Sequence, residues 1–89
     1  MSLRPFNSIL PTLGQRVFVD PSAQLVGDIM LDDDVSIWPL VAARGDVNRI
    51  RIGARSNIQD NSVLHVTHDG RYTPGGAPLL IGADVTVGH

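Results

Sequence analysis

Residues 19–37 read VDPSAQLVGDIMLDDDVSI, and an aliphatic residue returns at every sixth position of this stretch: Val19, Leu25, Leu31 and Ile37. A fixed short period marks a repeat architecture and takes precedence over assigning elements one at a time. Turn-forming residues such as Gly27 and Asp28 separate the aliphatic positions, which lack the i, i+3, i+4, i+7 spacing of an amphipathic helix. The pattern therefore predicts short strands throughout.

The period extends over most of the chain, with two interruptions. Its positions are Leu13, Val19, Leu25, Leu31, Ile37, Ala43, Ile52, Ile58, Leu64, Ile81 and Val87. Between Ala43 and Ile52 the spacing is nine residues, three more than the period. A second insertion, residues 67–79, is rich in Gly and Pro, and we expect it to form a loop.

Three hexads, about eighteen residues, make one coil of a triangular prism. The aliphatic positions then fall on three faces: Leu13, Leu31, Ile52 and Ile81 on the first; Val19, Ile37, Ile58 and Val87 on the second; Leu25, Ala43 and Leu64 on the third. The tripeptide Ile-Gly-Ala occurs twice, at 52–54 and 81–83, on the first face. The prediction is an all-β, left-handed parallel β-helix of hexapeptide repeats, forming one domain over 1–89 with about three and two-thirds coils after a lead-in at 1–12.

The composition of the chain limits the classes of partner and site that it can have. The net charge is -2 and the seven Lys and Arg residues are scattered, so we expect no nucleic-acid partner. The absence of cysteine excludes disulfides, thiolate zinc sites and a cysteine nucleophile. The first residues contain no apolar stretch of signal-peptide or membrane-span length, which predicts a cytoplasmic protein without a membrane partner. A core of this size is marginal by itself, so we expect self-association.

The histidines are the candidate metal ligands, and their places in the repeat distinguish them. His65 follows a third-face position, one coil above Arg44. His89 falls over Asp60 on the second face, and these two faces meet at a corner. The residue stacked over His65 would be the fifth after His89, beyond the given chain. His68, at the start of the inserted loop, is interpreted as a surface histidine and only a minor candidate ligand.

Four motifs occur in order on this frame: Arg44-Gly45-Asp46, Asn57-Ile58-Gln59-Asp60, Val63-Leu64-His65-Val66-Thr67-His68 and Val85-Thr86-Val87-Gly88-His89. Together they resemble consecutive motifs of the γ-class carbonic anhydrases and their bacterial homologues, over roughly residues 13–89. The resemblance implies a homotrimer that binds zinc between adjacent subunits, with iron or cobalt as alternative metals. It also implies later coils and a C-terminal helix, so we expect the chain to be truncated at its C-terminus.

The resemblance assigns roles to individual residues. His65 and His89 match two of the three zinc ligands, and the third is expected five positions after His89. Three neutral imidazoles leave one zinc position for water, whose pKa falls to about 7. The implied reaction is the reversible hydration of carbon dioxide to bicarbonate, with Gln59 matching the residue thought to orient the attacking hydroxide.

Arg44, Asp46 and Asp60 have a structural interpretation that we favour over direct catalysis. A guanidinium fork can pair with a carboxylate across a subunit interface, and Asp60 is the expected partner of Arg44.

Two other functions remain open. The acidic proton-shuttle loop of active family members is replaced here by residues 66–72, and Val47 follows Asp46 where such members carry a second acid. These departures favour a non-catalytic metal-binding or scaffold protein. A hexapeptide-repeat acyltransferase, with a histidine base and a coenzyme A groove, shares the β-helix but lacks the combination of motifs found here.

Overall fold

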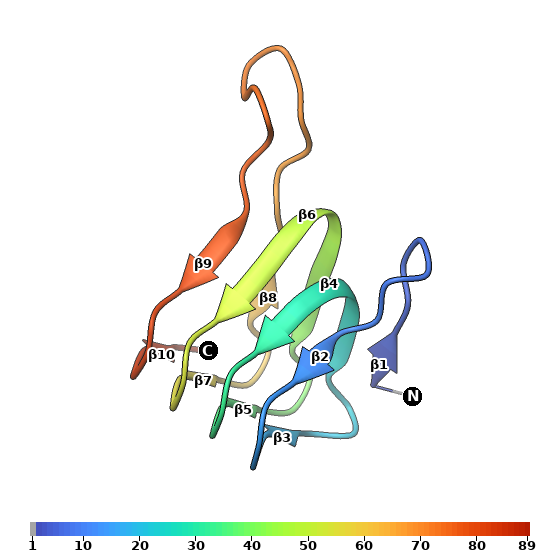
Figure 1. The fold of residues 1–89 in the computed structure, drawn as a ribbon. Helices are drawn as coiled ribbons and strands as arrows, with labels where there is room; N and C mark the ends of the chain where they lie inside the picture. Colours follow the sequence, from blue (N-terminus) through green and yellow to red (C-terminus); the bar gives the residue numbers. More distant parts are fainter. Residues whose placement is uncertain (1) are drawn as a thin grey trace.

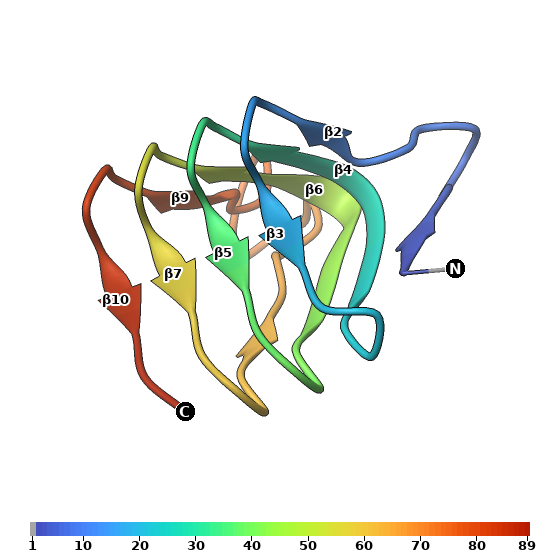
Figure 2. The ribbon, with the colours of Figure 1, turned by 90° about the horizontal axis from the view of Figure 1, so that it is seen from below.

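In the computed structural model, which describes residues 2–89, the chain winds in successive coils whose strands pair in parallel with neighbouring coils (Figure 1). The strands are β1 (Leu3–Arg4), β2 (Thr12–Leu13), β3 (Phe18–Val19), β4 (Gln24–Leu31), β5 (Ser36–Ile37), β6 (Ala42–Ile52), β7 (Asn57–Ile58), β8 (Val63–Leu64), β9 (Leu79–Ile81) and β10 (Thr86–Val87). One sheet contains β1, β2, β4, β6, β8 and β9, and the other stacks β10, β7, β5 and β3 in that order (Figure 2). This is the predicted left-handed parallel β-helix.

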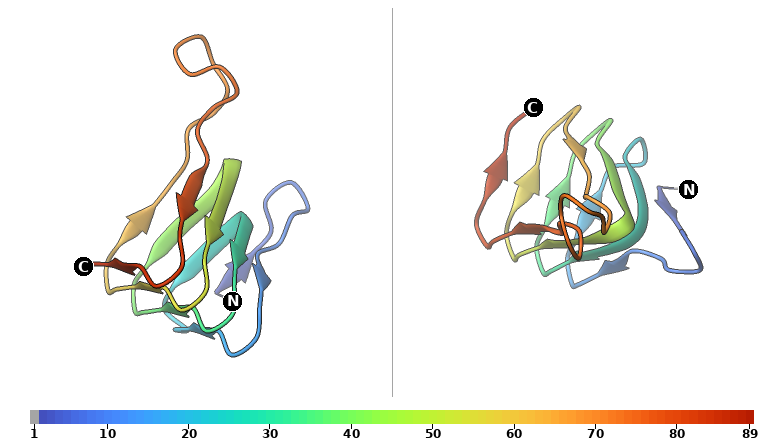
Figure 3. Two further views of the ribbon diagram at one scale, coloured as in Figure 1. Left: turned by 60° about the vertical axis from the view of Figure 1, so that its left-hand side comes forward. Right: turned by 90° about the horizontal axis from the view of Figure 1, so that it is seen from above.

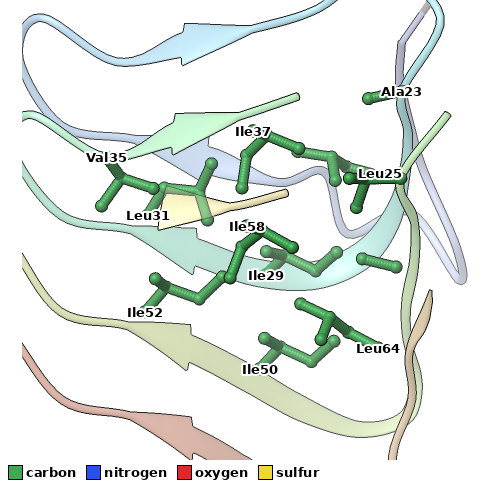
Figure 4. Close-up of a cluster of buried hydrophobic side chains, with 12 residues drawn as sticks. Ala23, Leu25, Ile29, Leu31, Val35, Ile37, Ile50, Ile52, Ile58 and Leu64 are labelled. Carbon is green, nitrogen blue, oxygen red and sulfur yellow. The ribbon is translucent and has the colours of Figure 1, made fainter. Parts of the chain in front are cut away.

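The strand registers confirm the three predicted faces. Paired in columns are Leu13, Leu31, Ile52 and Ile81; Val19, Ile37, Ile58 and Val87; and Leu25, Ala43 and Leu64. A shift of one residue would turn every inward side chain outward, so the aliphatic period determines this register. Figure 4 shows the buried members of these columns, among them Leu31, Ile52 and Ile58, gathered in the interior. The buried hydrophobic residues are all aliphatic: Ala23, Leu25, Ile29, Leu31, Val35, Ile37, Val41, Ala43, Ile50, Ile52, Ile58 and Leu64.

The longest strands, β4 and β6, continue from the third face to the first around one corner of the prism. Gly27 pairs with Gly45, whereas Ile29 pairs with Ile50, so three extra residues of β6 bulge outward here. This bulge is the slip that the sequence shows between Ala43 and Ile52. Gly27 has a φ of 86°, and a Cβ there would lie 2.4 Å from the Gly45 carbonyl oxygen. Only glycine fits both the backbone conformation and the space.

A ladder of ion pairs follows the corner between the first and second faces. Arg16, Asp34, Arg55 and Asp84 occupy equivalent turns, each with a positive φ between 56° and 62°. Arg16 binds Asp34 through two hydrogen bonds of 2.7 and 3.1 Å, and Arg55 binds Asp84 through two of 2.8 and 3.0 Å. Each pair links consecutive coils, and the arginine hydrogen bonds lower the pKa of both carboxyl groups.

Two segments depart from the repeat. Within the predicted lead-in, β1 pairs with β4, which places Leu3 beside Leu25 and starts the stack earlier than the hexads indicate. The inserted loop projects from the coils (Figure 3) and closes through the pairing of Thr67 with Ala77. Asn48, in the β6 bulge, donates hydrogen bonds of 3.3 Å to two of the loop's carbonyl groups.

Residues 2–89 contain no helix long and apolar enough to cross a membrane.

Candidate metal site

His65 lies on the outer surface of the third face, directly after β8. Leu64 points into the core, and the alternation of side chains along the strand turns His65 outward, where it is exposed. Because Ala43 pairs with Leu64, the next residues along, Arg44 and His65, lie in consecutive coils. This is the stacking that the sequence predicts for Arg44 and His65.

His89 follows β10 on the second face, where the predicted register also holds. Val87 pairs with Ile58, and the Gln59 N–H donates a 3.0 Å hydrogen bond to the Val87 carbonyl, so His89 continues over Asp60. A buried residue, Ser62, strengthens this placement by donating a 2.8 Å hydrogen bond to the Gly88 carbonyl. Sequence reasoning missed Ser62, although a serine between two aliphatic columns is a signal of a buried polar contact.

The imidazoles of His65 and His89 are suitable zinc donors, but two of them are fewer than a catalytic zinc site requires. Within residues 2–89 neither ring makes a hydrogen bond or an ion pair with the protein, so the ring nitrogens are available as ligands. Imidazole nitrogen is a preferred zinc donor, and a catalytic zinc has three protein ligands. The same residues contain no cluster of three or more His, Asp or Glu side chains able to hold a metal ion. One copy therefore offers two candidate imidazoles, fewer than the three protein ligands of a catalytic zinc.

Arg44 has a carboxylate partner in its own chain. Its Nη1 lies 3.3 Å from Oδ2 of Asp46, and the other oxygen of Asp46 accepts a 2.8 Å hydrogen bond from the Val47 N–H. Asp46 therefore restrains Arg44, which lies one coil below His65 in the same column. The pairing of Arg44 with Asp60 of another copy stays a prediction, and Asp60 itself is exposed.

His68 lies beyond the first pairing of the inserted loop. A Cβ placed on Gly70 would meet Nε2 of His68 at 3.4 Å, so the ring lies against the backbone of its own loop. Together with Arg71 and Tyr72 it borders a small hollow of about 200 Å³. This environment is consistent with the surface interpretation of His68.

A larger hollow of about 530 Å³ lies over β2, β4, β6 and β9. Its lining includes the exposed side chains of Met30 and Leu80, which places it on the outer surface of the first face. None of the predicted site residues lines this groove. His65 and His89 are therefore exposed residues on two different faces, outside this groove.

Comparison with known proteins supports the family that the motifs indicate. No family model matches the chain. Protein YrdA of Escherichia coli (strain K12) is 60% identical over 87 residues, which cover 98% of this chain and 47% of that protein. Gamma carbonic anhydrase 2, mitochondrial, of Arabidopsis thaliana is 44% identical over 79 residues, covering 89% of this chain and 28% of the relative. The chain belongs to the γ-carbonic anhydrase-like hexapeptide-repeat family.

A solved structure supports the fold of this γ-carbonic anhydrase-like chain. The hexapeptide transferase family protein from Anaplasma phagocytophilum matches with a TM-score of 0.81 and 34% sequence identity, over 98% of this chain and 46% of that one. The chain spans about half the length of YrdA and less of the plant protein.

Proposed function

We propose that this γ-carbonic anhydrase-like chain contributes His65 and His89 to a zinc site between copies, at which carbon dioxide is reversibly hydrated. One observation carries the proposal: the coil register places two exposed, unpartnered imidazoles on faces that share a corner. A third ligand must come from another copy or from residues outside 1–89, and a homotrimer is the assembly that the motifs favour. Iron or cobalt are alternative metals, and a cytoplasmic location stays a prediction.

The chain's own residues have distinct roles in this proposal. Bound zinc would supply the Lewis acidity that makes water a nucleophile at neutral pH. His65 and His89 would hold it through their ring nitrogens. Gln59 is the residue directly before Asp60, which lies beneath His89. The side-chain amide of Gln59 makes no hydrogen bond within residues 2–89. That amide is therefore free to orient the attacking oxygen.

A second candidate function, metal binding without catalysis, is favoured by the inserted loop. Asp69 is the one carboxylate in residues 66–72. Its Oδ1 accepts a 2.6 Å hydrogen bond from the Gly75 N–H, so this carboxylate holds the loop together. A group committed to loop structure is a poor carrier of protons between a site and solvent.

Zinc affinity tests the proposed site. Titration against a chromogenic zinc chelator should show weak binding by residues 1–89, because two imidazoles make an incomplete shell. His65→Ala and His89→Ala should each abolish this binding, and His68→Ala, the matched control, should leave it unchanged. Equal zinc affinity in the wild type and both of the first two variants would refute the site. If the site is confirmed, carbon dioxide hydration measured on the zinc-loaded assembly then distinguishes catalysis from metal binding alone.

A further inference from the structure

The inserted loop carries a group of polar side chains that the proposed zinc site does not use. They surround the hollow of about 200 Å³, which we call the loop hollow and which is lined by Thr67, His68, Gly70, Arg71, Tyr72 and Thr73. Within residues 2–89 no carboxylate lines this space. The carboxylate of the loop, Asp69, is engaged elsewhere, because it accepts a 2.6 Å hydrogen bond from the Gly75 N–H. Donors therefore gather here without an opposing negative charge.

Arg71 is a charged member of this lining that lacks a carboxylate partner in the part of the chain that the structure describes. Four other arginines pair with an aspartate: Arg16, Arg44, Arg51 and Arg55. The Arg71 guanidinium instead lies over the ring of Tyr72, 5.1 Å from the ring centroid. This contact restrains the guanidinium without using its N–H groups. A planar fork of free N–H donors is suited to pair with the two oxygens of a carboxylate or phosphate group.

The other polar side chains of the lining are also without hydrogen bonds. Neither the ring of His68 nor the hydroxyls of Thr67, Tyr72 and Thr73 make one within residues 2–89. An imidazole has at least one N–H in either protonation state, and each hydroxyl can donate. The loop hollow therefore offers several donors and one permanent positive charge to a single small space.

The loop that holds these donors is braced at its base and at its tip. Asn48 donates a 3.3 Å hydrogen bond to a carbonyl on each limb of the loop, those of Thr67 and Gly75. Nearer the tip, Gly70 and Thr73 exchange two backbone hydrogen bonds of 3.2 Å. Figure 3 shows the loop extending away from the coils. A loop that is already braced loses less conformational freedom when a ligand binds, which favours binding.

The size of the loop hollow limits the ligand that it can take. Its volume of about 200 Å³ is below the roughly 300–1,000 Å³ of pockets that bind drug-sized molecules. It equals the volume of about six water molecules, at roughly 30 Å³ each. One bicarbonate or phosphate ion is small enough to fit. Chloride is small enough too, but it lacks the paired oxygen atoms that a guanidinium fork recognises.

We propose that the loop hollow binds a small oxyanion, bicarbonate or phosphate, through the Arg71 fork, with His68 and the neighbouring hydroxyls as further donors. Both ions present the same kind of acceptor oxygens, and bicarbonate is also the product expected of the proposed function. The anion site does not depend on zinc, since neither His65 nor His89 lines the loop hollow. It gives His68 a role other than metal binding.

An NMR titration of the isotope-labelled chain tests this site. Sodium bicarbonate and sodium phosphate are added separately, with sodium chloride as the reference, all at one ionic strength because salt screens exposed charges. The backbone amide signals of Gly70, Arg71 and Tyr72 should shift and saturate with either oxyanion and not with chloride. Tighter binding of bicarbonate would assign the site to the product of the proposed reaction, and tighter binding of phosphate would assign it to the free ion.

Arg71→Gln should weaken oxyanion binding about tenfold, because it removes the charge-assisted hydrogen bonds of the fork. His68→Ala should weaken it by a smaller factor. The matched control is Arg4→Gln, since Arg4 is exposed in β1 and also lacks a carboxylate partner within residues 2–89. Its oxyanion affinity should equal that of the wild type. Amide signals outside residues 66–79 that match those of the wild type verify that each variant is folded.

Several outcomes would overturn the proposal. They are equal saturation by chloride, an Arg71→Gln variant that binds as tightly as the wild type, and equal weakening by Arg4→Gln, which would reveal only a general attraction to arginine. The zinc site is tested separately, because His65→Ala should lose zinc and keep the oxyanion, whereas Arg71→Gln should do the reverse. Oxyanion binding that needs Arg71, in a chain whose zinc affinity is unaffected by His65→Ala and His89→Ala, would support the loop hollow and refute the zinc site.

Discussion

Ser56 is a buried polar link between the coils that contain β7 and β10, and replacing it with alanine should destabilise the fold. Its hydroxyl donates a 2.6 Å hydrogen bond to the Gly82 carbonyl and accepts one of 2.9 Å from the Val85 N–H. Alanine would leave both backbone groups without this partner, at a cost of about 1–3 kcal/mol for each group that stays dry. Val85 is 37% exposed, so water can reach part of this site. We therefore expect Ser56→Ala to lose about 1–2 kcal/mol in total.

Urea unfolding followed by far-ultraviolet circular dichroism measures this loss. Thermal unfolding is a second measurement: in a domain of this length, each kcal/mol of lost stability should lower the midpoint by about 4–8 °C. The matched control is Ser36→Ala in β5, because Ser36 is on the outer surface and its hydroxyl makes no hydrogen bond within residues 2–89. If Ser56→Ala and Ser36→Ala unfold within about 0.5 kcal/mol of each other, the hydroxyl of Ser56 does not link the coils.

Two further predictions concern the corners of the prism. Gly27→Ala should destabilise the chain by more than the roughly 1 kcal/mol that alanine costs in the left-handed backbone conformation, because the alanine Cβ would also strike the Gly45 carbonyl. An unfolding free energy equal to that of the wild type would contradict this. Hydrogen bonds from Arg55 hold the pKa of Asp84 below its ordinary 3.8. The stabilisation by this pair is present above that value and is lost as the pH falls through the folded-state pKa, so Asp84→Asn should lose less stability than the wild type between pH 7 and 3. Identical losses, measured by urea midpoints, would show that the pair contributes nothing.

The six-residue period determined the fold by itself. The aliphatic residue at each repeat position faces the interior of its own coil, so the spacing along the chain fixes which residues share a column. This is why the stacking of His65 over Arg44 and of His89 over Asp60 follows from numbering alone, even across insertions of different length.

Tertiary structure decided the contacts that have no period. The hydroxyls of Ser56 and Ser62 reach carbonyl groups 26 residues away, a separation that depends on the length of the inserted loop. Leu3 joins the third face through a lead-in without hexads, and Arg44 takes Asp46 of its own chain as its partner. The left-handed turn at Leu40 is held by hydrogen bonds from the coils on either side. The period predicts which side chains point inward. The hydrogen-bond and packing partners described above depend instead on how coils of unequal length stack on one another.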